Sequence, residues 1–280
     1  MLARLEQAIG EIHDSESFRR YLAVQSRFHT YSWRNVALIL SQRPDATHVA
    51  GYQAWLRLHR FVKRGETGIK IIVPMRKKGT TEDREEELRL FFGTGTVFDV
   101  SQTEGEPLPE VAVPLLEGED GGPLFDQLLD FAQREGVHVA LSRGELPEHA
   151  AGAYWPDERR IRLGVAPMRQ LTKTLAHELA HHVHQTVLGE ESAERAEQET
   201  VAESVAYVVC QHFGLETGER SFPYVAIWAQ DRAGLQAALG TIQRVSTTLI
   251  GAIERNTSTA APEERAAIVE TPSPVPTSQN

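Results

Sequence analysis

The residues best able to do chemistry form one short motif, His177-Glu178-Leu179-Ala180-His181. The surrounding segment has the apolar spacing of a helix. Residues four apart on a helix lie on one face, so both imidazoles can reach a single ion while Glu178 lies beside it. A chance match in a chain of this length has a probability below about 1%. The motif therefore predicts a metal site on a helix.

Two histidines do not complete a catalytic zinc site, which usually has three protein ligands and a water molecule. The helix expected next, over about 192–213, offers Glu199 and Glu203 one turn apart. Glu203 lies among small apolar residues, where burial of a carboxylate is costly unless a cation compensates it. Glu203 is therefore the preferred third ligand. Glu199, in the more polar half of the helix, is the alternative ligand or an acceptor for the ring N–H of a ligand histidine.

This ligand set predicts metal-assisted hydrolysis. Zn²⁺ held by two imidazoles and a carboxylate keeps a position for water and lowers the pKa of that water toward about 7. Glu178 would take the proton as water attacks a carbonyl and then give it to the leaving amine. Tyr154, Tyr207 and Tyr224 are candidate donors to the transition state, and the sequence does not choose among them. The neighbouring His182 and His184 point away from the motif's face and are expected to be solvated or packed.

Composition excludes several other classes of protein. The chain has 280 residues, of which 41% are hydrophobic, and a single cysteine, Cys210. One thiol excludes an intramolecular disulfide framework and any all-thiolate metal site. No apolar run approaches the roughly 18 residues of a membrane span, and the amphipathic start with its acids is unlike an export signal. We therefore expect a cytoplasmic protein with no membrane partner.

Charge is divided unevenly along the chain. Residues 1–78 contain 14 Lys and Arg against 6 Asp and Glu, whereas residues 79–280 contain 15 against 33. Cations that track phosphates, interleaved with aromatic faces on which bases stack, are typical of sequence-tolerant binding to single-stranded DNA. An alternative stays open, in which Trp33 and Trp55 are core residues and the cations form a solvated face. The candidate DNA-binding residues are Trp33, Arg34, Asn35, Tyr52, Trp55, Arg57, Arg60, Lys63, Arg64 and Lys70.

The elements that must position these residues predict an α+β fold in two units. The first unit, residues 1–104, is expected to contain helices at 2–13, 15–28 and 33–41, a short helix from 51, and a small antiparallel sheet of strands 69–74 and 88–100 around a charged loop at 76–87. A Gly- and Pro-rich linker, 105–123, precedes the second unit, 124–254. That unit is expected to contain helices at 124–135, 167–187 and 192–213 and strands at 137–141 and 160–164. The Pro-, Ser- and Thr-rich tail, 255–280, is expected to be disordered.

The motif and the segment Glu199-Thr-Val-Ala-Glu-Ser-Val-Ala-Tyr207 together resemble the zincin-like metallopeptidases of the ImmA/IrrE and ArdC group. The resemblance implies a gluzincin arrangement in the second unit. His177 and His181 would bind the metal, Glu178 would be the base, and a downstream glutamate, Glu203 or its alternative Glu199, would be the third ligand.

The first unit resembles the N-terminal single-stranded-DNA-binding domain of ArdC-type antirestriction proteins, which occur on plasmids and other mobile elements. Four stretches carry the likeness: Tyr31–Ile39, Val49–Trp55, Val62–Ile71 and Val97–Thr103. The resemblance implies a zinc metallopeptidase tethered to single-stranded DNA, which hydrolyses DNA-associated protein substrates or protects mobile-element DNA. The alternatives are a non-catalytic DNA-binding antirestriction protein with a structural zinc, and an ImmA-like protease that cleaves one repressor.

Overall fold

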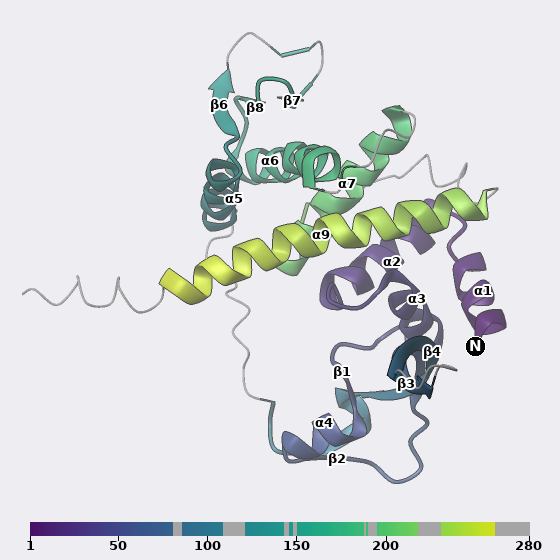
Figure 1. Cartoon of the computed structure of the whole chain (residues 1–280). Helices are drawn as coiled ribbons and strands as arrows, with labels where there is room; N and C mark the ends of the chain where they lie inside the picture. Colours follow the sequence, from purple (N-terminus) through teal and green to yellow (C-terminus); the bar gives the residue numbers. More distant parts are fainter. Residues whose placement is uncertain are drawn as a thin grey trace, which may run out of the picture.

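The computed structural model describes residues 1–80, 86–108, 121–142, 146–147, 150–187, 189, 195–217 and 231–260. Helices occupy the middle of the molecule, and small sheets lie at either end (Figure 1). The N-terminal part contains α1 (Leu2–Gly10), α2 (Ser15–Arg27), α3 (Trp33–Gln42), β1 (Val49–Gly51), α4 (Tyr52–Arg57), β2 (Arg60–Val62), β3 (Ile69–Thr80), β4 (Glu86–Asp99), the 3-10 turn η1 (Val100–Gln102) and β5 (Thr103–Gly105). The C-terminal part contains α5 (Gly122–Arg134), β6 (His138–Ser142), β7 (Gly152–Trp155), β8 (Arg160–Gly164), α6 (Met168–His182), the π-helical turn η2 (Val183–Val187), α7 (Arg195–His212) and α9 (Arg232–Ala260).

The helices α2 and α3 begin at residues whose side chains cap them. Asp14 accepts a hydrogen bond from the backbone N–H of Ser17 at 2.8 Å, and Ser32 accepts one from the backbone N–H of Asn35. The apolar faces of α1, α2 and α3 are buried together in the core. The predicted mixed α+β class and these three helices are confirmed.

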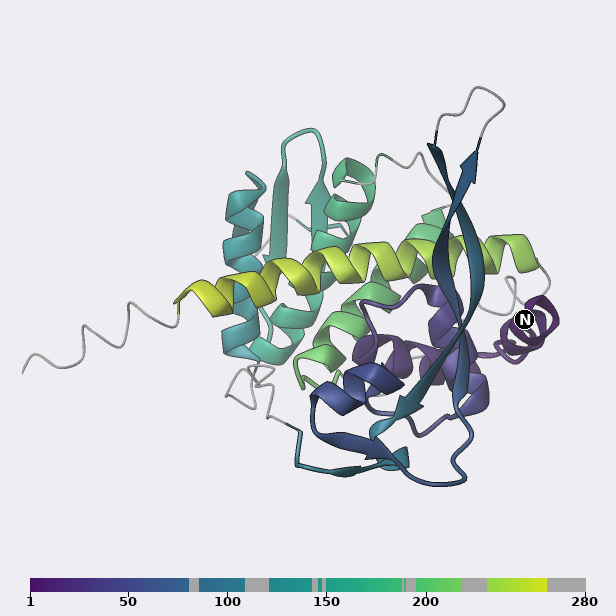
Figure 2. The same ribbon diagram turned by 60° about the horizontal axis from the view of Figure 1, so that its bottom comes forward.

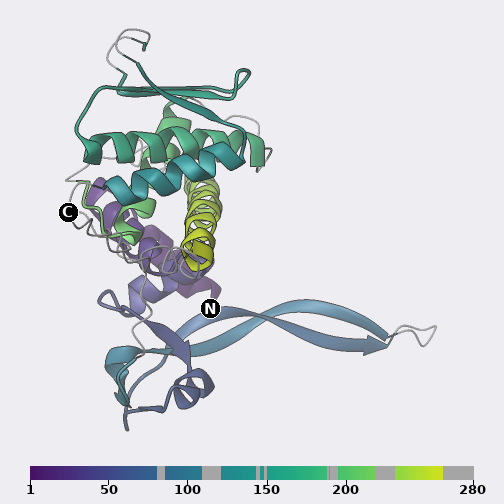
Figure 3. The ribbon, with the colours of Figure 1, turned by 90° about the vertical axis from the view of Figure 1, so that its left-hand side faces the viewer.

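The first sheet has the strand order β1-β4-β3, with both pairs antiparallel. Figure 3 shows the β3–β4 ribbon projecting far from the body of the molecule. The prediction of a loop over 76–87 was wrong, because β3 continues to Thr80 and β4 begins at Glu86, while residues 81–85 lie outside the described part of the chain. Backbone pairing in an antiparallel ribbon needs no apolar face, so a charged stretch can continue it.

The outer edge of β3 is closed by side chains of α3 rather than by another strand. The Asn35 amide donates to the carbonyl of Ile72 at 2.9 Å and accepts from its N–H at 2.8 Å. Two helical turns later, Gln42 forms the same pair of bonds with the backbone of Lys70, each at 2.9 Å. These amides satisfy the backbone groups that an edge strand otherwise leaves open.

The C-terminal sheet forms one layer over the helices α5 and α6 (Figure 3). Its strand order is β6-β8-β7, with β6 parallel and β7 antiparallel to β8. The edge strand β7 was not predicted. It packs on α6, the helix that carries the histidine motif.

One long helix, α9, crosses the molecule beside both groups of helices (Figures 1 and 2). It packs on α7 and α5 of the C-terminal part and on α3 of the N-terminal part. The tail predicted to start at residue 255 is helical as far as Ala260, and the rest of it, 261–280, lies outside the described residues. Among the described helices, none combines the length and the apolar character needed to cross a bilayer.

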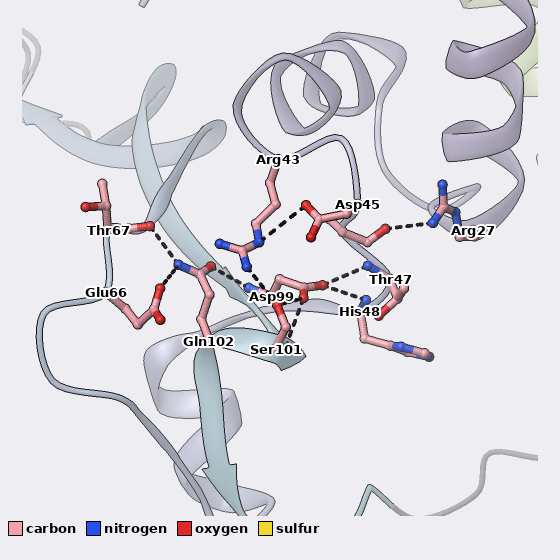
Figure 4. A network of polar contacts seen from close by, with 11 residues as sticks. Arg27, Arg43, Asp45, Thr47, His48, Glu66, Thr67, Asp99, Ser101 and Gln102 are labelled. Carbon is pink, nitrogen blue, oxygen red and sulfur yellow. Dashed lines mark hydrogen bonds and ion pairs between the residues drawn. The ribbon is translucent and has the colours of Figure 1, made fainter.

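A buried carboxylate organises the corner where β4 ends (Figure 4). Asp99 is 1% exposed and accepts hydrogen bonds from the backbone N–H groups of Thr47, His48 and Ser101 at 2.8, 3.1 and 2.9 Å. Burial alone would raise its pKa, but the hydrogen bonds from Ser101, Thr47 and His48 outweigh burial and lower it. The backbone N–H of Asp99 donates to Gln102, whose amide donates to Glu66 and to the carbonyl of Thr67.

We expect Asp99→Ala to lower the free energy of unfolding by about 2–4 kcal/mol at pH 7, because it removes a buried carboxylate and leaves three backbone N–H groups without their acceptor. Urea unfolding measures this loss. Since folding lowers the pKa of Asp99, its stabilising effect is present at neutral pH and is lost below about pH 4, where the two proteins should converge. Asp45→Ala, which removes an exposed ion pair with Arg43, is the control and should change stability by less than about 1 kcal/mol. Equal losses for both variants would contradict this role of Asp99.

Candidate metal centre

The helices α6 and α7 pack against each other and bring the histidine motif next to the two candidate glutamates. His177, Glu178 and His181 all lie within α6, as the motif predicted. Glu199 and Glu203 lie on α7. The candidate metal ligands described here therefore come from two neighbouring helices.

Three ligand atoms converge at this contact. The Nε2 atoms of His177 and His181 are 3.2 Å apart. Oε2 of Glu199 lies 3.2 Å from Nε2 of His177 and 3.8 Å from Nε2 of His181. These three residues form the one group of metal-ligating side chains found in the described part of the chain, with all ligand atoms within 4.8 Å of one another.

Glu203 contacts the other side of the His177 ring. Its Oε2 lies 3.5 Å from Nδ1 of His177, and its Oε1 lies 2.7 Å from Nζ of the buried Lys173. The cation that the burial of Glu203 requires is therefore already present one turn before His177 on α6. The geometry favours Glu199, the alternative that the sequence left open, over Glu203 at the face shared by the two imidazoles.

The carboxylates close to the two histidines shift the pKa values of the groups in the site. Burial opposes a charged His177, but hydrogen bonds to Glu199 and Glu203 and the charge of Glu178 raise the pKa of His177 to about 9. Burial likewise opposes a charged Glu203, but His177 and Lys173 lower the pKa of Glu203 to about 2. The pKa of Glu199 is lowered by its hydrogen bonds to His177 and His181.

Glu178 has the opposite shift, because burial raises its pKa. Only 6% of the residue is exposed, and its carboxylate accepts a hydrogen bond from the backbone N–H of Tyr154 on β7. Strand β7 can approach this closely because Gly152 has no side chain. A Cβ there would lie 2.6 Å from Thr174 and 3.1 Å from the carboxylate of Glu178. Together β7, α6 and α7 line a cavity of about 810 Å³ into which Glu178 and the three converging side chains face.

The candidate transition-state donors have different surroundings. The hydroxyl of Tyr154 is hydrogen-bonded to Nδ1 of His182 at 2.8 Å, so it is directed toward a histidine that is 1% exposed. Tyr207 is buried in α7, and Tyr224 lies outside the described residues. His182 is a packed side chain, as expected from its direction on the helix, but its partnership with Tyr154 had no signal in the sequence.

Three residues predicted to bind DNA lie in the interior instead. Trp33 and Trp55 are 6% and 2% exposed, and the indole N–H of Trp55 donates to the carbonyl of Phe98 at 2.9 Å. The amide of Asn35 is committed to the edge of β3. Residue type alone could not separate these roles, because an aromatic ring that can stack on a base also packs well in a core.

Several of the predicted cations already have partners within the chain. Arg60 donates to the side chain and carbonyl of Thr103, Lys63 to the carbonyl of Ser101, and Lys70 to the hydroxyl of Thr96. Arg34 lies over the ring of Trp33, with its guanidinium carbon 4.5 Å from the ring centroid, and is still exposed. The remaining candidates that are exposed to solvent are Tyr52, Arg57 and Arg64.

The fold and the site together define a mixed α+β protein with a candidate metal centre between two helices. Residues 2–98 match the family described as the N-terminal domain of anti-restriction factor ArdC. The N-terminal part of the chain therefore matches the ArdC N-terminal domain, as its N-terminal stretches predicted. The resemblance of the C-terminal part to ImmA/IrrE-type metallopeptidases stays a prediction.

A curated relative and two solved structures are also similar to the chain. The uncharacterized protein pXO2-81 of Bacillus anthracis is 27% identical over 265 residues, a match that covers 80% of this chain and 45% of the relative. The chain therefore spans about half the length of that curated relative. Crystal structures of the antirestriction ArdC protein from the R388 plasmid, one metal-free and one Mn(II)-bound, have TM-scores of 0.56 and 0.52. Each is 19% identical and matches 81% of this chain and 85% of ArdC, a likeness that shows the fold alone.

We expect binding of Zn²⁺ to release about one proton from His177 at pH 7. A ligand nitrogen must lose its proton to bind metal, and in the metal-free protein His177 keeps its proton up to about pH 9. Affinity should therefore rise with pH between 7 and 9. Titration calorimetry in two buffers of different ionisation enthalpy counts the protons. Glu203→Gln removes one group that raises the pKa of His177 and should reduce the number released. An affinity that does not change over this pH range would refute the expectation.

Proposed function

We propose that this chain is a metal-dependent peptidase, with Zn²⁺ as the expected ion, whose N-terminal part binds single-stranded DNA. The observation that carries the catalytic half is the convergence of His177, His181 and Glu199 beside the buried carboxylate of Glu178. Two imidazoles and one carboxylate are a donor set typical of catalytic zinc sites. A scaffold that merely fixed the ion would not need the further, non-ligating carboxylate of Glu178 next to it.

The charges of the site fit a cation. Glu178, Glu199 and Glu203 surround the two histidines, and Lys173 is paired with only one of these carboxylates. A divalent ion would balance the rest, held by His177, His181 and Glu199. When bound, the metal supplies a Lewis acid that polarises a carbonyl and makes water a better nucleophile.

Each of the chain's own residues then has a separate task. Glu203 accepts the Nδ1–H of His177, which fixes the ring and leaves Nε2 as the free nitrogen. Lys173 holds Glu203 in that position. Glu178, whose pKa is raised by burial, can take a proton from water and return it to a leaving amine.

The proposal that the N-terminal part binds DNA rests on its match to the ArdC N-terminal domain and on its exposed cations. Relatives of this family are named for antirestriction, which suggests that the chain protects incoming DNA in a similar way. Arg34, Arg57 and Arg64 are exposed on a part of the chain with excess positive charge, whereas the acidic remainder would be repelled by DNA. We infer that DNA holds the peptidase near protein substrates bound to the same strand.

A non-catalytic antirestriction protein with a structural metal is the second candidate. Binding of DNA alone could shield a strand from nucleases, and the fold shared with ArdC is compatible with either function. An ImmA-like protease that cleaves one repressor would instead show weak binding to DNA and a narrow choice of substrate.

The assignment of Glu199 as third ligand predicts unequal losses from two matched variants. Glu203→Gln should weaken Zn²⁺ binding by about 10–100-fold, as for other carboxylates behind a ligand histidine. Glu199→Gln, which removes a metal ligand, should weaken it more. Competition with a chromophoric chelator gives both affinities, and urea unfolding of the metal-free proteins controls for folding. A larger loss for Glu203→Gln would make Glu203 the ligand.

The peptidase proposal predicts that Glu178→Gln keeps its metal but loses at least about 100-fold in cleavage, because the base is gone. The assay uses a restriction endonuclease bound to single- and double-stranded DNA, with bound Zn²⁺ measured in parallel. Glu158→Gln, a carboxylate outside the cavity, is the control. Unchanged cleavage by Glu178→Gln would remove Glu178 as base. If the variant protects plasmid DNA in a restricting host as well as the parent does, the non-catalytic function is correct.

A further inference from the structure

A second cavity lies in the N-terminal part, far from the histidine motif in the sequence. It has a volume of about 770 Å³ and lies between α1, the end of α3 and the turn at residues 64–68. We propose that this cavity binds the phosphate group of a nucleotide. Where that nucleotide belongs to a DNA strand, the inference rests on the DNA-binding half of the proposed function.

The positive charge of the cavity favours an anionic ligand. Its charged lining consists of the four cations Arg4, Arg43, Arg64 and Lys70 and the single carboxylate of Glu66. That carboxylate already accepts a hydrogen bond from the amide of Gln102 at 2.8 Å. A concave site of net positive charge on a chain with a net charge of −10 concentrates anions where most of the chain repels them.

The walls are fixed before any ligand arrives. Gln42 exchanges two hydrogen bonds with the backbone of Lys70 and also accepts one from Arg4 at 2.9 Å, so α1, α3 and β3 are tied together by one side chain. Gln102 ties the turn at Glu66 and Thr67 to the corner organised by Asp99 (Figure 4). A site built in this way loses little entropy on binding.

The arginines keep donors for a ligand. A guanidinium carries five N–H groups in a fork that matches two phosphate oxygens. Arg43 uses one nitrogen for the hydroxyl of Ser101 and another for an ion pair with Asp45 at 3.7 Å, and Arg4 uses one for Gln42. Arg64 lines the cavity from the turn at residues 64–68 and is exposed. We infer that the further N–H groups of these arginines serve as donors to the phosphate.

The lining indicates that phosphate is recognised rather than a base. Among the described residues that line the cavity there is no aromatic side chain on which a base could stack. Recognition of this kind does not depend on the base. The phosphate could belong to a DNA strand or to a free nucleotide, and these two sources give different results in a binding experiment.

The test uses the full-length chain and three probes. These are dAMP and a thymidine oligonucleotide of about 12 nucleotides with either a 5′-phosphate or a 5′-hydroxyl. Arg64→Gln and Arg4→Gln should each weaken binding of the probe that uses the cavity by about tenfold or more, the loss expected for one charge-assisted hydrogen bond. For an oligonucleotide, the dependence of log K on log salt should also decrease by about 0.7 for each phosphate that a variant no longer neutralises. Arg20→Gln, an exposed cation on α2 outside the cavity, should bind like the parent.

The outcomes separate the two proposals. Loss of oligonucleotide binding by both cavity variants, with dAMP as a competitor of the parent, supports a strand-anchoring site. Binding of dAMP that depends on Arg64 and Arg4, without binding of any oligonucleotide, supports the cavity as a free-nucleotide site and refutes the DNA tether. Oligonucleotide binding that is equal in the parent and in both variants overturns the cavity proposal and leaves the tether intact. Absence of binding to all three probes overturns both.

Discussion

The structure depends on one electrostatic problem, which is how to hold two half-buried imidazoles among three carboxylates at the contact of α6 with α7. Lys173 neutralises one of the three carboxylates by pairing with Glu203 at 2.7 Å. The negative charge of the carboxylates still raises the pKa of His177, so this imidazole tends to hold a proton. A proton and a divalent ion compete for the same nitrogen in such a site. Packing then has to hold like charges close together, and the apolar residues between the two helices and α9 provide it.

The helix that carries both glutamates also connects the two ends of the molecule. At the C-terminal end of α7, Nδ1 of His212 lies 2.9 Å from the carbonyl of Ser26 on α2, and Nε2 lies 3.0 Å from Glu254 on α9. The buried residues of both parts belong to one hydrophobic core. The candidate metal centre and the N-terminal helices are therefore supported by the same framework. The division of the chain into two units joined by a linker stays a prediction.

A feature of the fold or of the site could be predicted from the sequence when the residues that form it lie close together in the chain. The histidine motif lies on one helix, so its spacing alone was enough to find it. The prediction of Glu203 as a metal ligand could not include a partner on another helix, and Lys173 of α6 supplies a cation to this carboxylate. The helix α9 was not predicted, because its sequence combines apolar, small and polar residues. The strands of the β3–β4 ribbon were predicted too short, because the end of the ribbon is charged rather than alternating between apolar and polar residues.

The stretches that resemble the ArdC N-terminal domain turn out to be mostly structural. Trp55 supports β4, Asn35 closes β3, and Asp99 and Gln102 hold the corner next to the turn at residues 64–68. Buried residues of this kind specify a scaffold, whereas contacts with a flexible polyanion need only exposed cations in suitable positions. The resemblance to the ArdC domain therefore concerns the residues that build the second cavity more than the residues that would contact its ligand. That frame places cations from α1, the residue after α3, the turn and β3 around one space, and this is where we propose that a phosphate binds.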